Sequence, residues 1–162
     1  MTGLAGRTLL EPGDGSLGPL LRVTDDRLSP ATGYGRHDHR AVDVVAVVLA
    51  GALTHAWGEG APMAAGDVGV LRAGTGLAHD EVAGPEGARV VQAYLRAADP
   101  DAAPSHAVHR AVRGWVELGR PDARLWVGDD GPGVPGGVVL RLDGGPVLVW
   151  QVDTGRPAWS EG

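Results

Sequence analysis

The sequence contains no cysteine, no phenylalanine and no lysine, so all 14 of its basic residues are arginines. Without cysteine, neither a disulfide framework nor thiolate metal ligation is available. Because aromatic residues make up only 4%, the core must consist of valine, leucine and alanine, with five tryptophans as its large side chains. The formal net charge is −6 and no basic block occurs, which argues against nucleic acid and anionic membranes as partners.

Long apolar runs are also missing. No stretch approaches the ~18 consecutive apolar residues of a membrane-spanning helix. Residues 1–7 do not have the pattern of a signal peptide, since they contain one basic residue and no apolar segment. We therefore expect a soluble cytoplasmic protein, and its 162 residues fit one domain with a substantial core.

Glycine and proline are abundant, with 27 and 12 residues, and they separate short apolar runs instead of forming one tract. Such runs recur about every 8 to 12 residues, which predicts an all-β sandwich or barrel. Residues 42–49 are almost entirely valine, alanine and leucine, a composition typical of a strand buried on both faces. Gly51 then reads as a turn, and further strands are predicted at residues 53–57, 68–72, 77–82 and 89–95.

The last part of the chain carries a hairpin signal. Residues 138–142 and 147–152 are apolar and flank the turn sequence Asp143-Gly144-Gly145-Pro146. A two-stranded hairpin is marginally stable by itself. We therefore expect this one to be covered by the barrel, or by a second subunit.

Two pairs of residues could bind a metal ion. His37 and His39 are two residues apart, as are His79 and Glu81, so on strands each pair shares one face. Asp43 falls on the same face as His39 if the strand stays regular. Imidazole and carboxylate ligands suit iron, manganese, nickel, copper or zinc. Four such ligands leave open positions on a six-coordinate ion, as a catalytic site requires.

The other histidines give weaker signals. His55 follows Gly51 on a predicted strand, and we expect it to be structural or exposed and not a ligand. His106 and His109 lie in a polar stretch and are expected to be solvated.

Two segments resemble the motifs of a known family. Tyr34-Gly35-Arg36-His37-Asp38-His39-Arg40, with Asp43 and residues 48–55, resembles the first motif of the cupin superfamily in its pirin version. Residues 66–68 and 73–81, which end in His79-Asp80-Glu81, resemble the second pirin motif. The resemblance covers about residues 22–96. It implies a jelly-roll β-barrel that binds one divalent metal ion through His37, His39, His79 and Glu81. Iron(II) is favoured, with nickel, manganese, copper or zinc as alternatives.

The sequence departs from the pirin pattern in two places. Asp43 stands where the family usually has the longer glutamate, so we expect it to support a histidine ligand instead of binding the metal. Pirins typically have two barrels, and too few residues follow Arg96 for a second one. The expected fold is all-β, with a metal-binding cupin barrel at residues 1–104. Residues 105–162 are expected to form a reduced second half packed on that barrel, not an independent domain.

The resemblance implies a dioxygenase-type oxidoreductase, similar to quercetinases, that acts on a small flavonol-like or enolic aromatic substrate. Glu81 would bind the metal or accept the enol proton as a general base. Two alternatives remain open, because a fold does not determine a function. One is a non-oxidative metal enzyme, such as an isomerase or cyclase, and the other is a metal-containing regulatory binding module without catalysis. A homodimer is left open.

Overall fold

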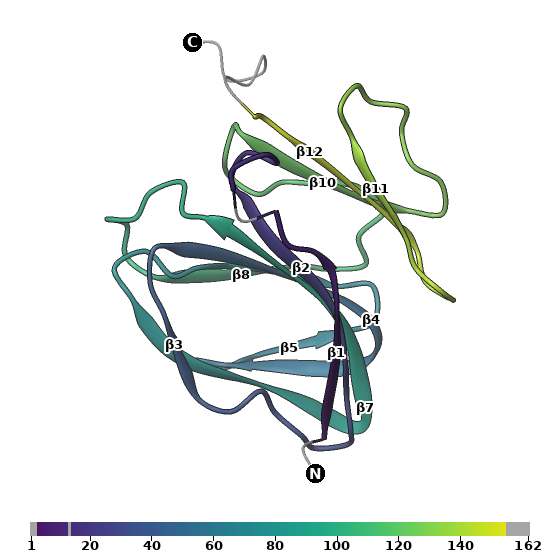
Figure 1. The fold of residues 1–162 in the computed structure, drawn as a ribbon. Helices are drawn as coiled ribbons and strands as arrows, with labels where there is room; N and C mark the ends of the chain where they lie inside the picture. The colour runs from purple at the N-terminus through teal and green to yellow at the C-terminus, as the bar shows by residue number, and fades with distance from the viewer. Residues whose placement is uncertain (1–2, 13, 155–162) are drawn as a thin grey trace.

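The computed structural model describes residues 3–12 and 14–154 and is built of two antiparallel sheets (Figure 1). The larger sheet contains β1 (Leu4–Leu10), β2 (Leu20–Leu28), β3 (His37–His39), β4 (Val42–Ala56), β5 (Ala61–Ala64), β6 (Val68–Arg72), β7 (Leu77–Arg96) and β8 (Ser105–His109). The smaller sheet contains β9 (Gly114–Val116), β10 (Ala123–Gly128), β11 (Val138–Arg141) and β12 (Val147–Val152). The all-β prediction is confirmed. Within the described part of the chain, no helix has the length and apolar character needed to span a membrane.

The long strands β4 and β7 belong to both layers of the barrel. In the first layer, they pair with each other between β2 and β6, in the order β1-β2-β7-β4-β6-β8. In the second layer, the beginning of β7 pairs with β3 and with the end of β4, which in turn pairs with β5. The second layer therefore has the order β3-β7-β4-β5.

Two facing glycines lie where β4 and β7 pass from one layer to the other. Gly51 and Gly87 both have positive φ, 70° and 80°, and a Cβ atom at Gly51 would collide with the carbonyl oxygen of Gly87. The register also shifts between Val48 and Ala50 and again between Gly51 and Leu53. Bulges and left-handed glycines bend a strand without ending it. Gly51, expected to be a turn between two strands, is a bend within one continuous strand.

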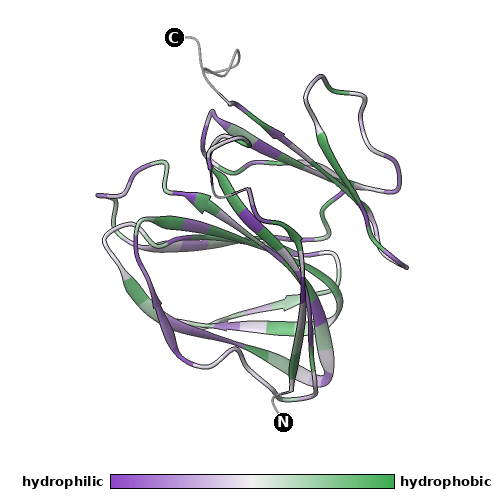
Figure 2. Cartoon of the chain, in the orientation of Figure 1, coloured by the Kyte–Doolittle hydropathy of each residue, from purple (hydrophilic) through white to green (hydrophobic). Residues whose placement is uncertain are grey.

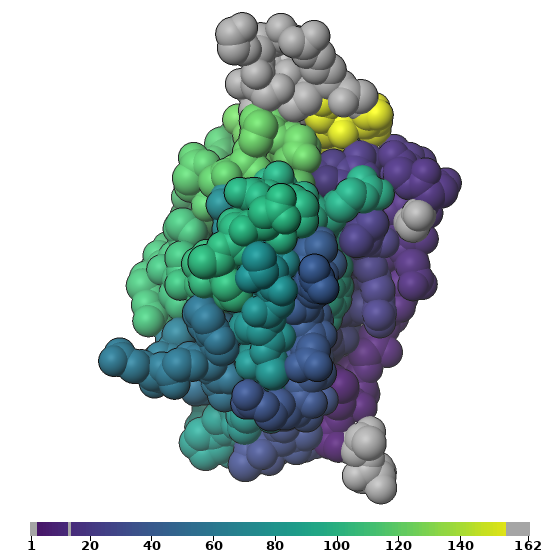
Figure 3. All heavy atoms as spheres, turned by 90° about the vertical axis from the view of Figure 1, so that its left-hand side faces the viewer, coloured from purple at the N-terminus to yellow at the C-terminus, as the bar shows by residue number. Residues whose placement is uncertain are grey.

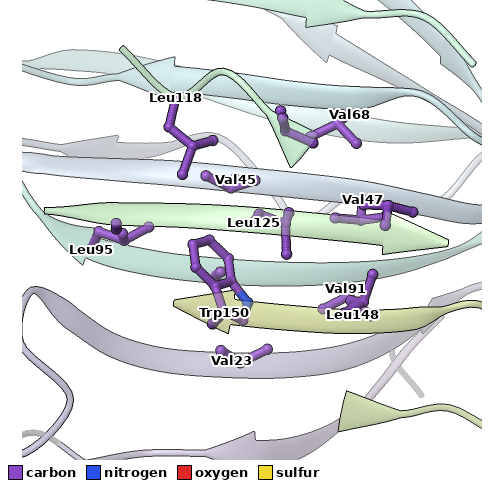
Figure 4. Close-up of a cluster of buried hydrophobic side chains, with 14 of the residues drawn as sticks. Val23, Val45, Val47, Val68, Val91, Leu95, Leu118, Leu125, Leu148 and Trp150 are labelled. Atoms are coloured by element: carbon purple, nitrogen blue, oxygen red, sulfur yellow. The ribbon is translucent and has the colours of Figure 1, made fainter. Parts of the chain in front are cut away.

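The small sheet packs on the outer face of the first layer. Val45 and Val47 of β4 belong to the cluster between the two sheets, which Figure 4 shows with Leu125, Leu148 and Trp150. The alternate residues of β4 pack inside the barrel in a second cluster. This confirms the prediction that residues 42–49 are buried on both faces. Bands of apolar and polar residues alternate along many of the strands (Figure 2).

The predicted C-terminal hairpin is confirmed. β11 and β12 are antiparallel, with register from Val138 opposite Trp150 to Arg141 opposite Val147.

The boundary expected at residue 104 does not coincide with a change of sheet, because β8 pairs with β6 in the larger sheet. The small sheet begins at β9, and residues 155–162 of the expected second half lie outside the described residues. In the view of Figure 3, green atoms of the C-terminal half lie above the blue and teal barrel segments.

Trp150 tests whether the small sheet is essential to stability. It is 1% exposed and packs between the two sheets, so Trp150→Ala should lower the free energy of unfolding by about 3 to 5 kcal/mol. Val139→Ala is the control, because Val139 is 48% exposed on β11, and it should change stability little. Urea unfolding followed by circular dichroism measures both. Equal, small losses would show that the barrel is stable without this packing.

Candidate metal centre

Three histidines from neighbouring strands of the second layer meet in space. His37 and His39 lie on β3, and His79 lies on β7 directly opposite His37 in the register. Because side chains alternate along a strand, His37 and His39 share the face of β3 that His79 approaches. Among the described residues, these three form the cluster able to hold a metal ion, and their ligand atoms all lie within 4.8 Å of one another.

The Nε2 atoms of the three rings point at one another. His37 Nε2 lies 2.9 Å from His39 Nε2 and 3.0 Å from His79 Nε2. Two nitrogens at right angles on an ion with bonds of about 2.1 Å are separated by about 3.0 Å. The nitrogen spacing therefore fits a single transition-metal ion.

The Nδ1 atoms of two of these rings have other partners. His37 Nδ1 donates to the carbonyl oxygen of Gly35 at 2.6 Å, and His79 Nδ1 lies 2.7 Å from His55 Nε2. A neutral imidazole protonated on Nδ1 presents a lone pair at Nε2. In its neutral form, His37 therefore presents a lone pair at Nε2 to both of its neighbours, and a cation placed there would bind lone pairs from all three rings at once.

The surroundings favour the neutral forms of His39 and His79. Burial lowers the pKa of His79 to about 3, and the neighbouring histidines act in the same direction. Burial, followed by His37, also lowers the pKa of His39. Metal ligation requires the neutral form of imidazole. These rings are therefore ready to bind a metal at neutral pH.

Glu81 lies near the histidines but is held by another side chain. It is 4% exposed, and its Oε1 accepts a hydrogen bond from Gln92 Nε2 at 2.9 Å. Burial raises the pKa of Glu81 to about 7, while Gln92 and His37 oppose this shift. Glu81 is not a member of the three-histidine cluster. Its assignment as a fourth ligand stays a prediction.

Asp43 lies elsewhere than expected. It is followed along β4 by Val45 and Val47, which face the small sheet, and its Oδ2 accepts from Arg120 Nη1 at 2.9 Å. Ala41, between β3 and β4, has φ of 55°, so the strand does not stay regular from His39 to Asp43. The expectation that Asp43 supports a histidine ligand is corrected, because it forms a buried ion pair with the C-terminal half.

Two histidines outside the predicted ligand set approach the cluster. His55 is 1% exposed on β4 and contacts His79. His106 on β8 stacks on His55 with ring centroids 3.8 Å apart, so the expectation that His106 is solvated is wrong. The signal for His55 lay in the sequence, because it shares strand parity with the buried Leu53. His106 gave no comparable signal, since its position depends on the pairing of β8 with β6.

The bent two-layer barrel and the histidine cluster are the features of a cupin with a candidate metal site. A sequence model of the family described as Pirin matches residues 10–95, more than half of the chain. The chain therefore belongs to the pirin family of the cupin superfamily, as its motifs indicated.

Curated relatives and solved structures agree with this assignment. A pirin-like protein from Caulobacter vibrioides is 34% identical over 98 residues, covering 59% of this chain and 42% of the relative. A quercetin 2,3-dioxygenase from Escherichia coli is 28% identical over 108 residues, which cover 63% of this chain and 47% of that enzyme. The chain thus spans less than half the length of these relatives. The bacterial pirin YhhW from Escherichia coli, in complex with nickel(II), has a similar fold, with a TM-score of 0.66 and 20% identity. That match covers 88% of this chain and 71% of YhhW.

Asp43→Ala tests whether the Asp43–Arg120 ion pair stabilises the fold without affecting the histidine cluster. Asp43→Ala should lower the free energy of unfolding by about 1.5 to 3 kcal/mol, because Arg120 loses one charged partner and keeps Asp122. Metal affinity should not change, since Asp43 faces away from the histidines. Asp129→Ala is the control, because the Asp129–Arg113 pair is highly exposed. Denaturant unfolding and nickel(II) titration measure the two properties, and weaker metal binding with unchanged stability would contradict this placement.

Proposed function

We propose that this chain binds one divalent transition-metal ion through His37, His39 and His79, with Glu81 as the fourth ligand. We further propose that this centre belongs to a dioxygenase acting on a small flavonol-like or other enolic aromatic substrate. The convergence of three imidazole nitrogens carries the proposal. The similarity to a quercetin 2,3-dioxygenase supports the class of reaction.

The donor set accepts several metal ions. Imidazole and carboxylate ligands bind iron, nickel, manganese, copper and zinc. We favour iron(II), and the nickel(II) in the YhhW structure makes nickel the first alternative to test. The chemistry that such an ion supplies when bound is Lewis-acid stabilisation of an enolate and activation of dioxygen.

The surrounding residues supply position and proton transfer. The hydrogen bond from Gln92 engages Oε1 of Glu81, which leaves the other carboxylate oxygen to bind the metal or, when released from it, to accept the enol proton. The ring of Tyr94 lies 5.9 Å from the ring of His39 and gives the site an aromatic wall. Both features suit a planar, weakly acidic aromatic ligand.

Oxygen uptake tests the proposed reaction. Protein loaded separately with iron(II), nickel(II), manganese(II), copper(II) or zinc(II) is mixed with quercetin or a simpler enolic aromatic in an oxygen electrode. We expect one dioxygen to be consumed per substrate with at least one redox-active metal. Glu81→Gln should lower kcat about 10²- to 10⁴-fold through loss of proton transfer. His79→Ala should abolish both metal binding and uptake, whereas the control His109→Ala should change neither.

The alternatives predict other results in the same experiment. Substrate turnover without oxygen uptake would identify an isomerase or cyclase. Metal binding without turnover of any enolic aromatic would contradict the dioxygenase and favour a regulatory module. A wild-type protein that binds no metal would contradict all three functions.

A further inference from the structure

The histidine cluster has a fourth imidazole beside it that the proposed ligand set does not use. We propose that His55 is a positioning residue, which accepts a hydrogen bond from His79 Nδ1 and so directs His79 Nε2 at the metal. This inference rests on the proposed metal centre. It adds that tight metal binding requires His55, although His55 is not itself a ligand.

The register of the barrel brings the two rings together. His55 on β4 lies directly opposite Glu81 on β7, so His79, two residues earlier, is its diagonal neighbour on the same face. His55 Nε2 lies 2.7 Å from His79 Nδ1, and both residues are 1% exposed. Water therefore does not compete for this hydrogen bond.

The chemistry of the ligand determines the direction of the bond. If His79 binds through Nε2, its ring proton is on Nδ1, and a buried N–H group requires an acceptor. Metal-bound histidines usually donate this proton to a carboxylate, a backbone carbonyl or water. His37 follows that rule with the carbonyl of Gly35, whereas His79 has the imidazole nitrogen of His55. His55 must then be neutral, with its own proton on Nδ1.

His55 is itself held in place by the neighbouring layer. The ring of His106 stacks on it with an interplanar angle of 23° and a centroid distance of 3.8 Å. Gly69 on β6 leaves room for this stack, because a Cβ atom there would lie 3.0 Å from His106 Nε2 and 2.7 Å from Met63 Sδ. The support therefore extends from β8 through His55 to the metal ligand.

The geometry does not favour His55 as another ligand. His55 Nε2 contacts Nδ1 of His79, on the side of that ring away from the cluster. The atom that His79 directs at His37 is Nε2. Accordingly, the cluster found among residues 3–12 and 14–154 does not include His55. Its contribution would be to orient a ligand and fix its tautomer.

Two substitutions at one position separate this contribution from simple packing. His55→Phe keeps a ring and removes the acceptor, whereas His55→Gln keeps an acceptor oxygen near the position of Nε2. The apoprotein is titrated with cobalt(II), whose absorption spectrum reports ligand geometry. We expect His55→Phe to bind about 10- to 100-fold more weakly and to change the spectrum. His55→Gln should recover most of the affinity and the wild-type spectrum. The control His109→Phe, at a histidine of β8 outside these contacts, should match wild type.

The outcomes distinguish this inference from the proposed function. If wild type binds cobalt and His55→Phe binds it equally well with the same spectrum, the positioning contribution is refuted and the metal centre stands. If wild type binds no metal, the centre itself fails, and this inference fails with it. Should His55→Phe not fold, ring ¹⁵N NMR of the zinc-loaded wild type decides. We expect a proton on His79 Nδ1 and none on His55 Nε2, and the reverse assignment would overturn the inference.

Discussion

The convergence of three imidazole nitrogens on one point is the constraint that the other elements of this fold serve. His37 Nε2 lies 2.9 Å and 3.0 Å from two other ring nitrogens, and its own Nδ1 proton is committed to Gly35. A ring proton on Nε2 of His39 or of His79 can bridge its contact with His37. A cation at this point could instead be bound by all three rings, whose donor type and spacing suit a transition-metal ion.

The rest of the fold holds these rings at that distance. β4 and β7 bend at Gly51 and Gly87, so that they contribute to both layers of the barrel. The histidine cluster lies in the second layer, and the main core lies against the first. The small C-terminal sheet covers the outer face of that core layer. Trp150 packs between the small sheet and the core layer, and the ion pair between Asp43 and Arg120 links the C-terminal half to β4. The small sheet therefore stabilises the strands that position the histidine cluster, and none of the cluster's three residues lies in that sheet.

The sequence predicted the structure best where the residues concerned lie on one strand. Parity correctly placed His37 beside His39, and composition correctly predicted that residues 42–49 are buried on both faces. Parity failed for Asp43, because the left-handed Ala41 intervenes. It could not reveal the stack of His106 on His55, which arises from pairing between distant strands. Local periodicity does not encode such tertiary contacts.

X-ray absorption of the metal-loaded wild-type protein tests whether His37, His39 and His79 bind one ion together. Imidazole rings give a multiple-scattering pattern that allows them to be counted around the absorbing ion. We expect one ion per chain, with three imidazole nitrogens at about 2.0 to 2.2 Å and oxygen in the remaining positions. An ion with one imidazole or none in its coordination sphere would contradict the account.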